Sequence, residues 1–283
     1  MYPLKIVACV VMGNHIHILA VVIEPADVPR FKEYTKRELS HAVNRLLGRR
    51  NRTVWIDGCD DPVIMDAEKA IERIVYLYTN PQKANLVESI EEYPNFTTWE
   101  SFLAGGCVEV FPRIARPSIE VLLPSRSLRE HYEIAERLLA EAEEEYELQI
   151  EPDAWISCFP ELEGVSPEEL RDMIISKVRE QEKLYGESRT TPVIGAHALK
   201  LQDIRKPYTS KKFGKRMLCL SSFRSLRAAY IAWRLELHEQ ARKCYDQWRE
   251  GDSSVVMPPG MFWPGGWLNA PCDVSIGEFY SFC

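Results

Sequence analysis

Two apolar, β-prone runs that flank a Gly-Asn dipeptide constrain the fold of this chain more than any other feature. The runs are Ile6–Met12 and Ile18–Ile23, and the Gly-Asn pair between them favours a tight hairpin turn. Side chains at positions i and i+2 of a strand stand on the same face. His15 and His17 can therefore present both imidazoles to one point, which is half of a metal site. The alternative interpretation places one histidine in solvent and hydrogen-bonds the other within the sheet.

A second segment reads as a helix over residues 67–80, with Asp66 as its N-cap and Pro81 as its stop. Tyr76 and Asn80 are four residues apart and share one edge of this helix. A nucleophile and a metal ligand could sit together there. The alternative makes Tyr76 a half-buried aromatic and Asn80 a helix-ending residue. The expected apolar face is formed by Ile71, Ile74, Val75 and Tyr78.

The two segments resemble the REP-associated tyrosine transposases, relatives of the single-tyrosine HUH transposases of small insertion sequences. The resemblance is carried by Asn14-His15-Ile16-His17, by Tyr76-x-Tyr-x-Asn80-Pro81 and by Lys83-Ala84-x-Leu86-Val87. It implies an α+β domain in which helices pack on one face of an antiparallel, ferredoxin-like sheet. Relatives have a further strand and helix before the hairpin. We therefore expect this sheet to lack one strand and to have an exposed edge beside the site.

The resemblance also implies a role for each site residue. His15 and His17 would bind a divalent metal, Mg²⁺ or Mn²⁺, with Asn80 as the third ligand. Tyr76 would be the nucleophile, because it lies four residues before the asparagine. Tyr78 is the competing candidate, but it points roughly 200° away around the helix, so only one of the two can face the metal.

A site of this kind would cut and rejoin single-stranded DNA through a phosphotyrosine intermediate. The leading hypothesis is a DNA transposase or domesticated single-strand endonuclease that recognises hairpin-bearing DNA. The second is a catalytically inactive protein that only binds single strands. The third is a metal hydrolase of the His-x-His barrel type, which ranks last because no repeating strand–helix units follow. Family members often dimerise, so a homodimer is compatible with the resemblance.

A basic loop between the two motifs is the candidate DNA-contacting element. It follows an amphipathic helix expected over residues 29–47, and four arginines lie close to one aromatic side chain. Arginines can pair with phosphates while an indole stacks a base, as single-strand binding requires. A solvated basic turn with a buried tryptophan is the simpler alternative. The residues are Arg45, Arg49, Arg50, Arg52 and Trp55.

Composition is that of a soluble globular protein with a net charge of −7. Eight cysteines without any CxxC pair indicate a reducing compartment, and the cytoplasm is the expected location. The N-terminal apolar run is interrupted by Gly, Asn and two His, so it fits neither a signal peptide nor a membrane span.

We divide the chain into three regions. Residues 1–104 form the catalytic domain, residues 105–199 an acidic helical region, and residues 200–283 a basic helical region with an aromatic tail. The acidic region is expected to contain helices over Leu128–Leu148 and after the capping-box signature at Ser166. The basic region is expected to contain a cationic segment over residues 205–216 and a long helix from about Ser222 to Trp248.

Overall fold

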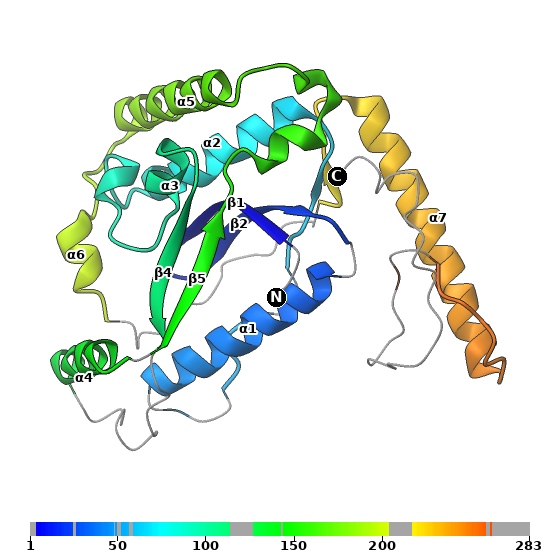
Figure 1. The fold of residues 1–283 in the computed structure, drawn as a ribbon, viewed down its shortest axis with the longest axis horizontal. Coiled ribbons are helices and arrows are strands. Elements are labelled where there is room, and N and C mark those ends of the chain that lie inside the picture. Colours follow the sequence, from blue (N-terminus) through cyan, green and yellow to red (C-terminus); the bar gives the residue numbers. More distant parts are fainter. Residues whose placement is uncertain are drawn as a thin grey trace.

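The computed structural model describes residues 4–24, 27–47, 49, 52–56, 59–113, 127–142, 144–203, 217–258 and 261. A four-stranded sheet and the helices around it form the body, and the long helix α7 extends at one side (Figure 1). The strands are β1 (Leu4–Val11), β2 (Ile16–Val22), β3 (Val63–Ile64), β4 (Cys107–Arg113), β5 (Glu144–Ile150) and β6 (Cys219–Leu220). The α-helices are α1 (Asp27–Leu46), α2 (Ala67–Lys83), α3 (Trp99–Leu103), α4 (Leu128–Ala140), α5 (Pro167–Ser188), α6 (Ala196–Lys200) and α7 (Arg224–Arg249). Short 3₁₀ turns are η1 (Ile90–Glu92), η3 (Ala154–Cys158) and η4 (Pro160–Leu162).

The predicted hairpin is confirmed. β1 and β2 pair antiparallel and end with Val11 opposite Ile16. The Met12 amide donates to the His15 carbonyl at 2.8 Å, so the Gly-Asn pair occupies the two central positions of the turn. Residues 7–10 are all buried, which means that both faces of β1 are covered.

The predicted α+β class is confirmed, but the sheet is mixed rather than wholly antiparallel. Its order is β2-β1-β5-β4, in which β4 and β5 are antiparallel and β5 meets β1 in parallel at Ile6 and Ile150. Further along β1, the Val11 amide donates to the Phe96 carbonyl and the Thr98 amide donates to the Cys9 carbonyl. β1 is therefore paired on both sides, and β2, which carries His17, is an edge strand of the sheet.

The expected helix over Leu128–Leu148 is wrong in its second half. Helix α4 ends at Ala140, and β5 begins at Glu144. Tyr146, Leu148 and Ile150 alternate with polar residues, and this period of two fits a strand. The high glutamate content concealed that period. Because β4 and β5 belong to the main sheet, a boundary at residue 104 divides a single structural unit, and residues 105–199 are not purely helical.

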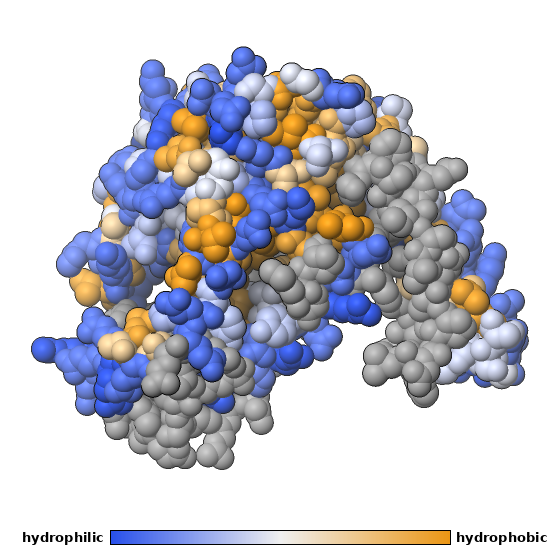
Figure 2. Space-filling view, in the orientation of Figure 1, coloured by the Kyte–Doolittle hydropathy of each residue, from blue (hydrophilic) through white to orange (hydrophobic). Residues whose placement is uncertain are grey.

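β4, one of the two edge strands of the sheet, has exposed hydrophobic side chains at Val108 and Val110 on one face and at Phe111 on the other. Figure 2 shows a largely hydrophilic face with hydrophobic side chains gathered near its centre. An exposed edge strand of this kind can pair with a strand from another chain.

Helix α2 lies between the sheet and α5, and α1 lies below the sheet in the same view (Figure 1). The predicted apolar face of α2 is confirmed, because Ile74 and Tyr78 are fully buried while Ile71 and Val75 pack against the core. Asp66 caps the helix by accepting from the Lys69 amide. The predicted end at residue 80 is wrong by three residues, because Pro81 lies inside the last turn and α2 continues to Lys83. The core shared by β1, α2, α3 and α5 includes Val7, Val10, Ile74, Leu77, Tyr78, Trp99, Phe102, Ile174 and Val178.

Part of the C-terminal region docks at the beginning of α2. β6 pairs in parallel with β3, and the Ser222 amide donates to the second carboxylate oxygen of Asp66 at 2.8 Å. Burial opposes the charge of Asp66, but the amides of Lys69 and Ser222 outweigh it and lower the pKa of this carboxyl. The expected helices after Ser166 and near residues 222–248 are confirmed as α5 and α7. The cationic segment 205–216 and the tail from residue 262 lie outside the described residues.

Among the described helices, none combines the length and the apolar character that a membrane crossing requires.

Candidate active site

The β1–β2 hairpin and α2 bring four predicted site residues together, although 63 positions separate His17 from Asn80. The ring centroids of His15 and His17 are 4.7 Å apart. The His17 ring lies 5.8 Å from the Tyr76 ring, with the two planes nearly perpendicular. Nε2 of His17 is 2.5 Å from the side-chain nitrogen of Asn80. We call this group of four residues the His–Tyr cluster.

The local fold explains this convergence. β2 places His17 opposite Val10 of β1, and Val10 is buried in the core that β1 shares with α2. Tyr76 and Asn80 are one turn apart on α2 and therefore face the same way. Asn80 is only 6% exposed, so its amide is held by its surroundings.

Both histidines of the cluster favour the neutral form. Burial lowers the pKa of His15. Burial, then the neighbouring charges of His15 and Arg73, lowers the pKa of His17 to about 4. At neutral pH each ring keeps a lone pair that can bind a cation. Nδ1 of His15 lies 2.5 Å from the Asn14 side-chain oxygen, and when this nitrogen carries the hydrogen, Nε2 is left as the ligand.

The donor types in the cluster fit a divalent cation. The Asn80 amide turns its nitrogen toward His17, and half a rotation would present its oxygen at the same place. Two imidazole nitrogens and one amide oxygen would then converge, a mixed set that suits first-row divalent metals. No group of three or more His, Cys, Asp or Glu able to hold a metal occurs among the described residues. Asn80 is the side chain in this cluster that could add a third donor atom.

Tyr76 is half-buried and lies beside two cations. The Lys83 ammonium is 4.8 Å from the centre of the Tyr76 ring, and the Arg73 guanidinium carbon is 5.5 Å from it. Sequence reasoning used Lys83 only as part of a motif and missed Arg73 altogether. The spacing could have revealed both, because positions 73, 76, 80 and 83 fall within about one quarter of the helix circumference.

Tyr78 belongs to the core instead. It is 0% exposed, and its hydroxyl lies 3.0 Å from Oγ1 of Thr98. Its ring meets the Trp99 ring edge-on at 4.8 Å. Burial raises the pKa of its phenol, which opposes ionisation. Of the two candidate tyrosines, only Tyr76 lies in the His–Tyr cluster.

Trp55 of the predicted DNA-contacting loop packs back onto α1. It is half-buried, and its indole nitrogen donates to the Lys36 carbonyl at 2.9 Å. The Arg52 carbonyl accepts from the buried Asn44 side chain at 2.8 Å, which ties the loop to the end of α1. The loop is therefore anchored to α1, and its contact with DNA stays a prediction.

The arginines of this loop occupy different environments. Arg52 is exposed, and Arg49 donates to the Asn44 side-chain oxygen at 3.0 Å. One terminal nitrogen of Arg45 is buried without a hydrogen-bond partner among the described residues. Arg50 lies outside the described residues. Within the described part of the chain, no hydrogen bond or ring contact joins these side chains to the His–Tyr cluster.

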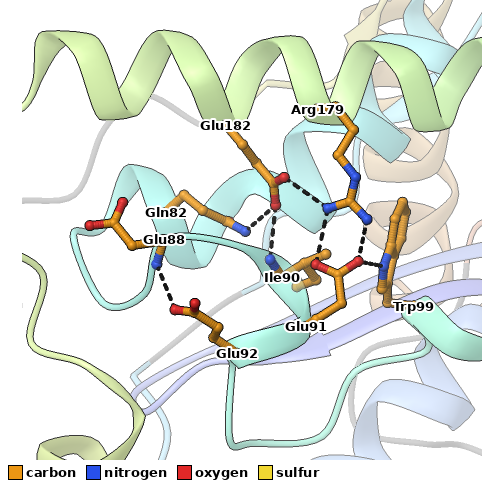
Figure 3. Close-up of polar contacts among 8 residues, drawn as sticks. All are labelled: Gln82, Glu88, Ile90, Glu91, Glu92, Trp99, Arg179 and Glu182. Carbon is orange, nitrogen blue, oxygen red and sulfur yellow. Dashed lines mark hydrogen bonds and ion pairs between the residues drawn. The ribbon is translucent and has the colours of Figure 1, made fainter.

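A polar network holds the C-terminal end of α2 against α5 (Figure 3). One oxygen of Glu182 accepts from the Gln82 side chain at 2.7 Å and from the Ile90 amide at 2.8 Å. Its other oxygen accepts from Arg179 at 2.9 Å. Gln82 is two residues beyond Asn80, so this network fixes the helical turn that carries part of the cluster.

Glu91 extends the network to the core. It pairs with Arg179 through both carboxylate oxygens and accepts from the Trp99 indole at 2.6 Å. The Arg179 hydrogen bond is the main reason that the pKa of Glu91 falls to about 2. The network therefore links α5 with η1, α3 and the last turn of α2.

Comparison with known proteins finds no matching family model, no matching curated protein and no matching solved structure.

Proposed function

We propose that this protein is a tyrosine DNA nuclease and strand transferase, a transposase or single-strand endonuclease that acts on hairpin-bearing DNA. One observation carries the proposal: Tyr76, His15, His17 and Asn80 lie in one cluster on a hairpin and a helix that are distant in sequence. Metal-assisted phosphoryl transfer needs a nucleophile beside a cation-binding group, and these residue types supply both.

Tyr76 is the nucleophile in the proposed reaction. Its hydroxyl oxygen forms a bond to the scissile phosphorus and loses its proton, and the bond from phosphorus to the 3′ oxygen breaks. The products are a 5′-phosphotyrosine and a free 3′ hydroxyl. Because the phosphodiester energy is stored in the covalent link, a 3′ hydroxyl from another strand can reverse the step and complete a strand transfer.

His15, His17 and Asn80 would hold a divalent cation, Mg²⁺ or Mn²⁺. When bound, that cation supplies polarisation of the scissile phosphodiester. Burial keeps His17 neutral and able to bind a cation at physiological pH. The network around Glu182 keeps Asn80 in register with His17 by fixing the end of α2.

A cytoplasmic location is part of the proposal. The six described cysteines have free thiols, which persist in a reducing compartment. The proposed partner is single-stranded or hairpin DNA, and the exposed edge strand β4 offers a surface on which a homodimer could form.

The test incubates purified protein and Mn²⁺ with a hairpin-bearing single strand labelled at either end. The 3′ label reports the covalent adduct, because the downstream fragment stays on the tyrosine, and the 5′ label reports the released 3′-hydroxyl fragment. We expect both products from the wild type and from Tyr78→Phe. Neither should form with Tyr76→Phe or with the His15→Ala/His17→Ala double variant.

Two outcomes would contradict the proposal. Cleavage that survives in Tyr76→Phe would exclude Tyr76 as the nucleophile. Binding without cleavage by the wild type, over substrates that vary in hairpin and flanking sequence, would instead support a non-catalytic single-strand DNA-binding protein.

A further inference from the structure

Two cations beside Tyr76 stand out in a chain whose net charge is −7. We infer that Arg73 and Lys83 form a phosphate-binding site, which holds a backbone phosphate of a nucleic acid strand next to the Tyr76 hydroxyl. This inference rests on the proposed function and deepens it by naming the residues that seat the strand at the nucleophile.

The placement of these side chains follows from the helix. Arg73 is three residues before Tyr76, and Lys83 is seven residues after it, so all three lie on one face of α2 together with Asn80. Lys83 lies 4.8 Å and Arg73 lies 5.5 Å from the centre of the Tyr76 ring. The two positive charges therefore meet at the side chain that would attack phosphorus.

The hydrogen bonding of Arg73 is incomplete. Its Nε atom is buried and has no partner among the described residues. A buried donor without an acceptor is costly, and a phosphate oxygen is a strong acceptor for a guanidinium. Arg73 as a whole is only partly buried, so a small movement of its guanidinium would bring this unsatisfied donor to a phosphate oxygen.

The charge balance around α2 points the same way. Within the described part of the chain, no carboxylate forms a salt bridge with Arg73 or Lys83. Elsewhere on α2, Lys69 pairs with Glu72 at 2.5 Å, and on α5 Arg179 pairs with Glu91 and Glu182. The two cations at Tyr76 are thus left available for an anion, in contrast to the paired cations nearby.

The aromatic ring adds a second element of recognition. A cation near a ring is attracted by its π electrons, so Tyr76 helps to hold both side chains in place without neutralising them. Arginine offers a planar fork of donors and lysine a single point charge, and both are common ligands of phosphate. The site is therefore suited to one phosphodiester rather than to a particular base.

The test measures single-stranded DNA binding and its salt dependence with the non-cleaving Tyr76→Phe protein, in EDTA. We compare the Tyr76→Phe protein with a protein that carries Tyr76→Phe together with Arg73→Gln/Lys83→Gln. Because the two cations share one phosphate of the strand, the double variant should lose one neutralised phosphate, and its slope of log K against log salt should be smaller by about 0.7. A competition with inorganic phosphate distinguishes a strand-binding site from a simple anion site, because only the former prefers the polymer at equal phosphate concentration.

Two further variants make the test specific. Lys177→Gln/Lys183→Gln removes the same charge from the exposed surface of α5 and should leave the slope unchanged. Arg73→Lys/Lys83→Arg keeps both charges and should retain most of the slope. Thermal unfolding of every variant shows whether the fold is intact.

An unchanged slope in the Arg73→Gln/Lys83→Gln protein, or an equal decrease in the α5 control, would overturn the inference. If the wild type still cleaves DNA in that case, the proposed function stands without it. If the wild type neither binds nor cleaves any single strand, the proposed function falls and this inference falls with it.

Discussion

The two faces of α2 differ in their burial and in the side chains that surround them. The face toward the core carries Ile74 and Tyr78, which are fully buried, and the opposite edge carries Tyr76 and Lys83 beside the histidines of the hairpin. Tyr76 and Tyr78 are the same residue type two positions apart. One is packed among Trp99 and Phe102, and the other lies between cations and imidazoles. Helix periodicity, rather than residue type, sets the surroundings of each ring.

Truncation of Tyr78 should lower the stability of the protein much more than truncation of Tyr76. Tyr78→Ala removes a fully buried ring from the core and should lower the free energy of unfolding by about 3–5 kcal/mol. Tyr76→Ala removes a half-exposed ring and should cost less than about 1 kcal/mol. Urea unfolding followed by tryptophan fluorescence measures both. Equal decreases in the two variants would mean that Tyr76 is also a core residue, and the comparison of faces would fail.

Local patterns predicted the parts of the molecule whose periodicity is clear. The hairpin at residues 12–15 and the apolar face of α2 follow from spacing within a few residues, and both are present. β5 was missed because the glutamates over residues 141–147 favour a helix and conceal the alternation of Tyr146, Leu148 and Ile150. Local propensity was misleading there, and pairing with β4 decided the conformation.

The candidate site was predictable only where a motif marked it. The resemblance identified His15, His17, Tyr76 and Asn80, and the structure brings these residues together. Arg73 was missed because it belongs to no motif. The hydrogen bond between Gln82 and Glu182 spans 100 positions, and no local pattern encodes an interaction over that separation. Tertiary packing alone shows what holds the end of α2.

The polar network between α2 and α5 sharpens the comparison, because it holds the end of α2 that carries Asn80 of the His–Tyr cluster. Glu182→Ala should lower the free energy of unfolding by about 2–3 kcal/mol, because the buried Gln82 side chain and the Ile90 amide would lose their acceptor and Arg179 would keep only Glu91. Glu180→Ala, on the exposed side of the same helix, should change stability by less than about 0.5 kcal/mol. Chemical denaturation provides both values. Similar small decreases for the two variants would show that the network does not hold α2.

Two substitutions of Asn80 test whether the His–Tyr cluster binds a metal. In the Tyr76→Phe background, Asn80→Ala should weaken Mn²⁺ binding about tenfold or more, because it removes one of three ligands. Asn80→Asp replaces the amide oxygen with a carboxylate oxygen and should restore or strengthen binding. Mn²⁺ affinity can be measured by electron paramagnetic resonance, with the exposed Asn95→Ala as the matched control. Unchanged affinity in Asn80→Ala would remove Asn80 from the ligand set.

The smallest expected effect is the pH dependence that His17 gives to the free energy of unfolding. The folded protein holds the pKa of His17 at about 4, below its ordinary value of 6.5, mainly because the ring is buried. Between these two values the unfolded chain binds a proton that the folded protein does not, so acidification favours unfolding. The contribution of the neutral His17 ring to the free energy of unfolding is complete above pH 6.5 and is lost as the pH falls toward 4. A fall from pH 6 to pH 5 should therefore lower the free energy of unfolding by about 1 kcal/mol.

His17→Gln should reduce this dependence of the free energy of unfolding on pH, whereas His41→Gln, at an exposed position on α1, should leave it unchanged. If the His17→Gln protein keeps the full slope in metal-free buffer, the imidazole is not desolvated at the face of α2, and the hairpin and helix are not packed as closely as their contacts indicate.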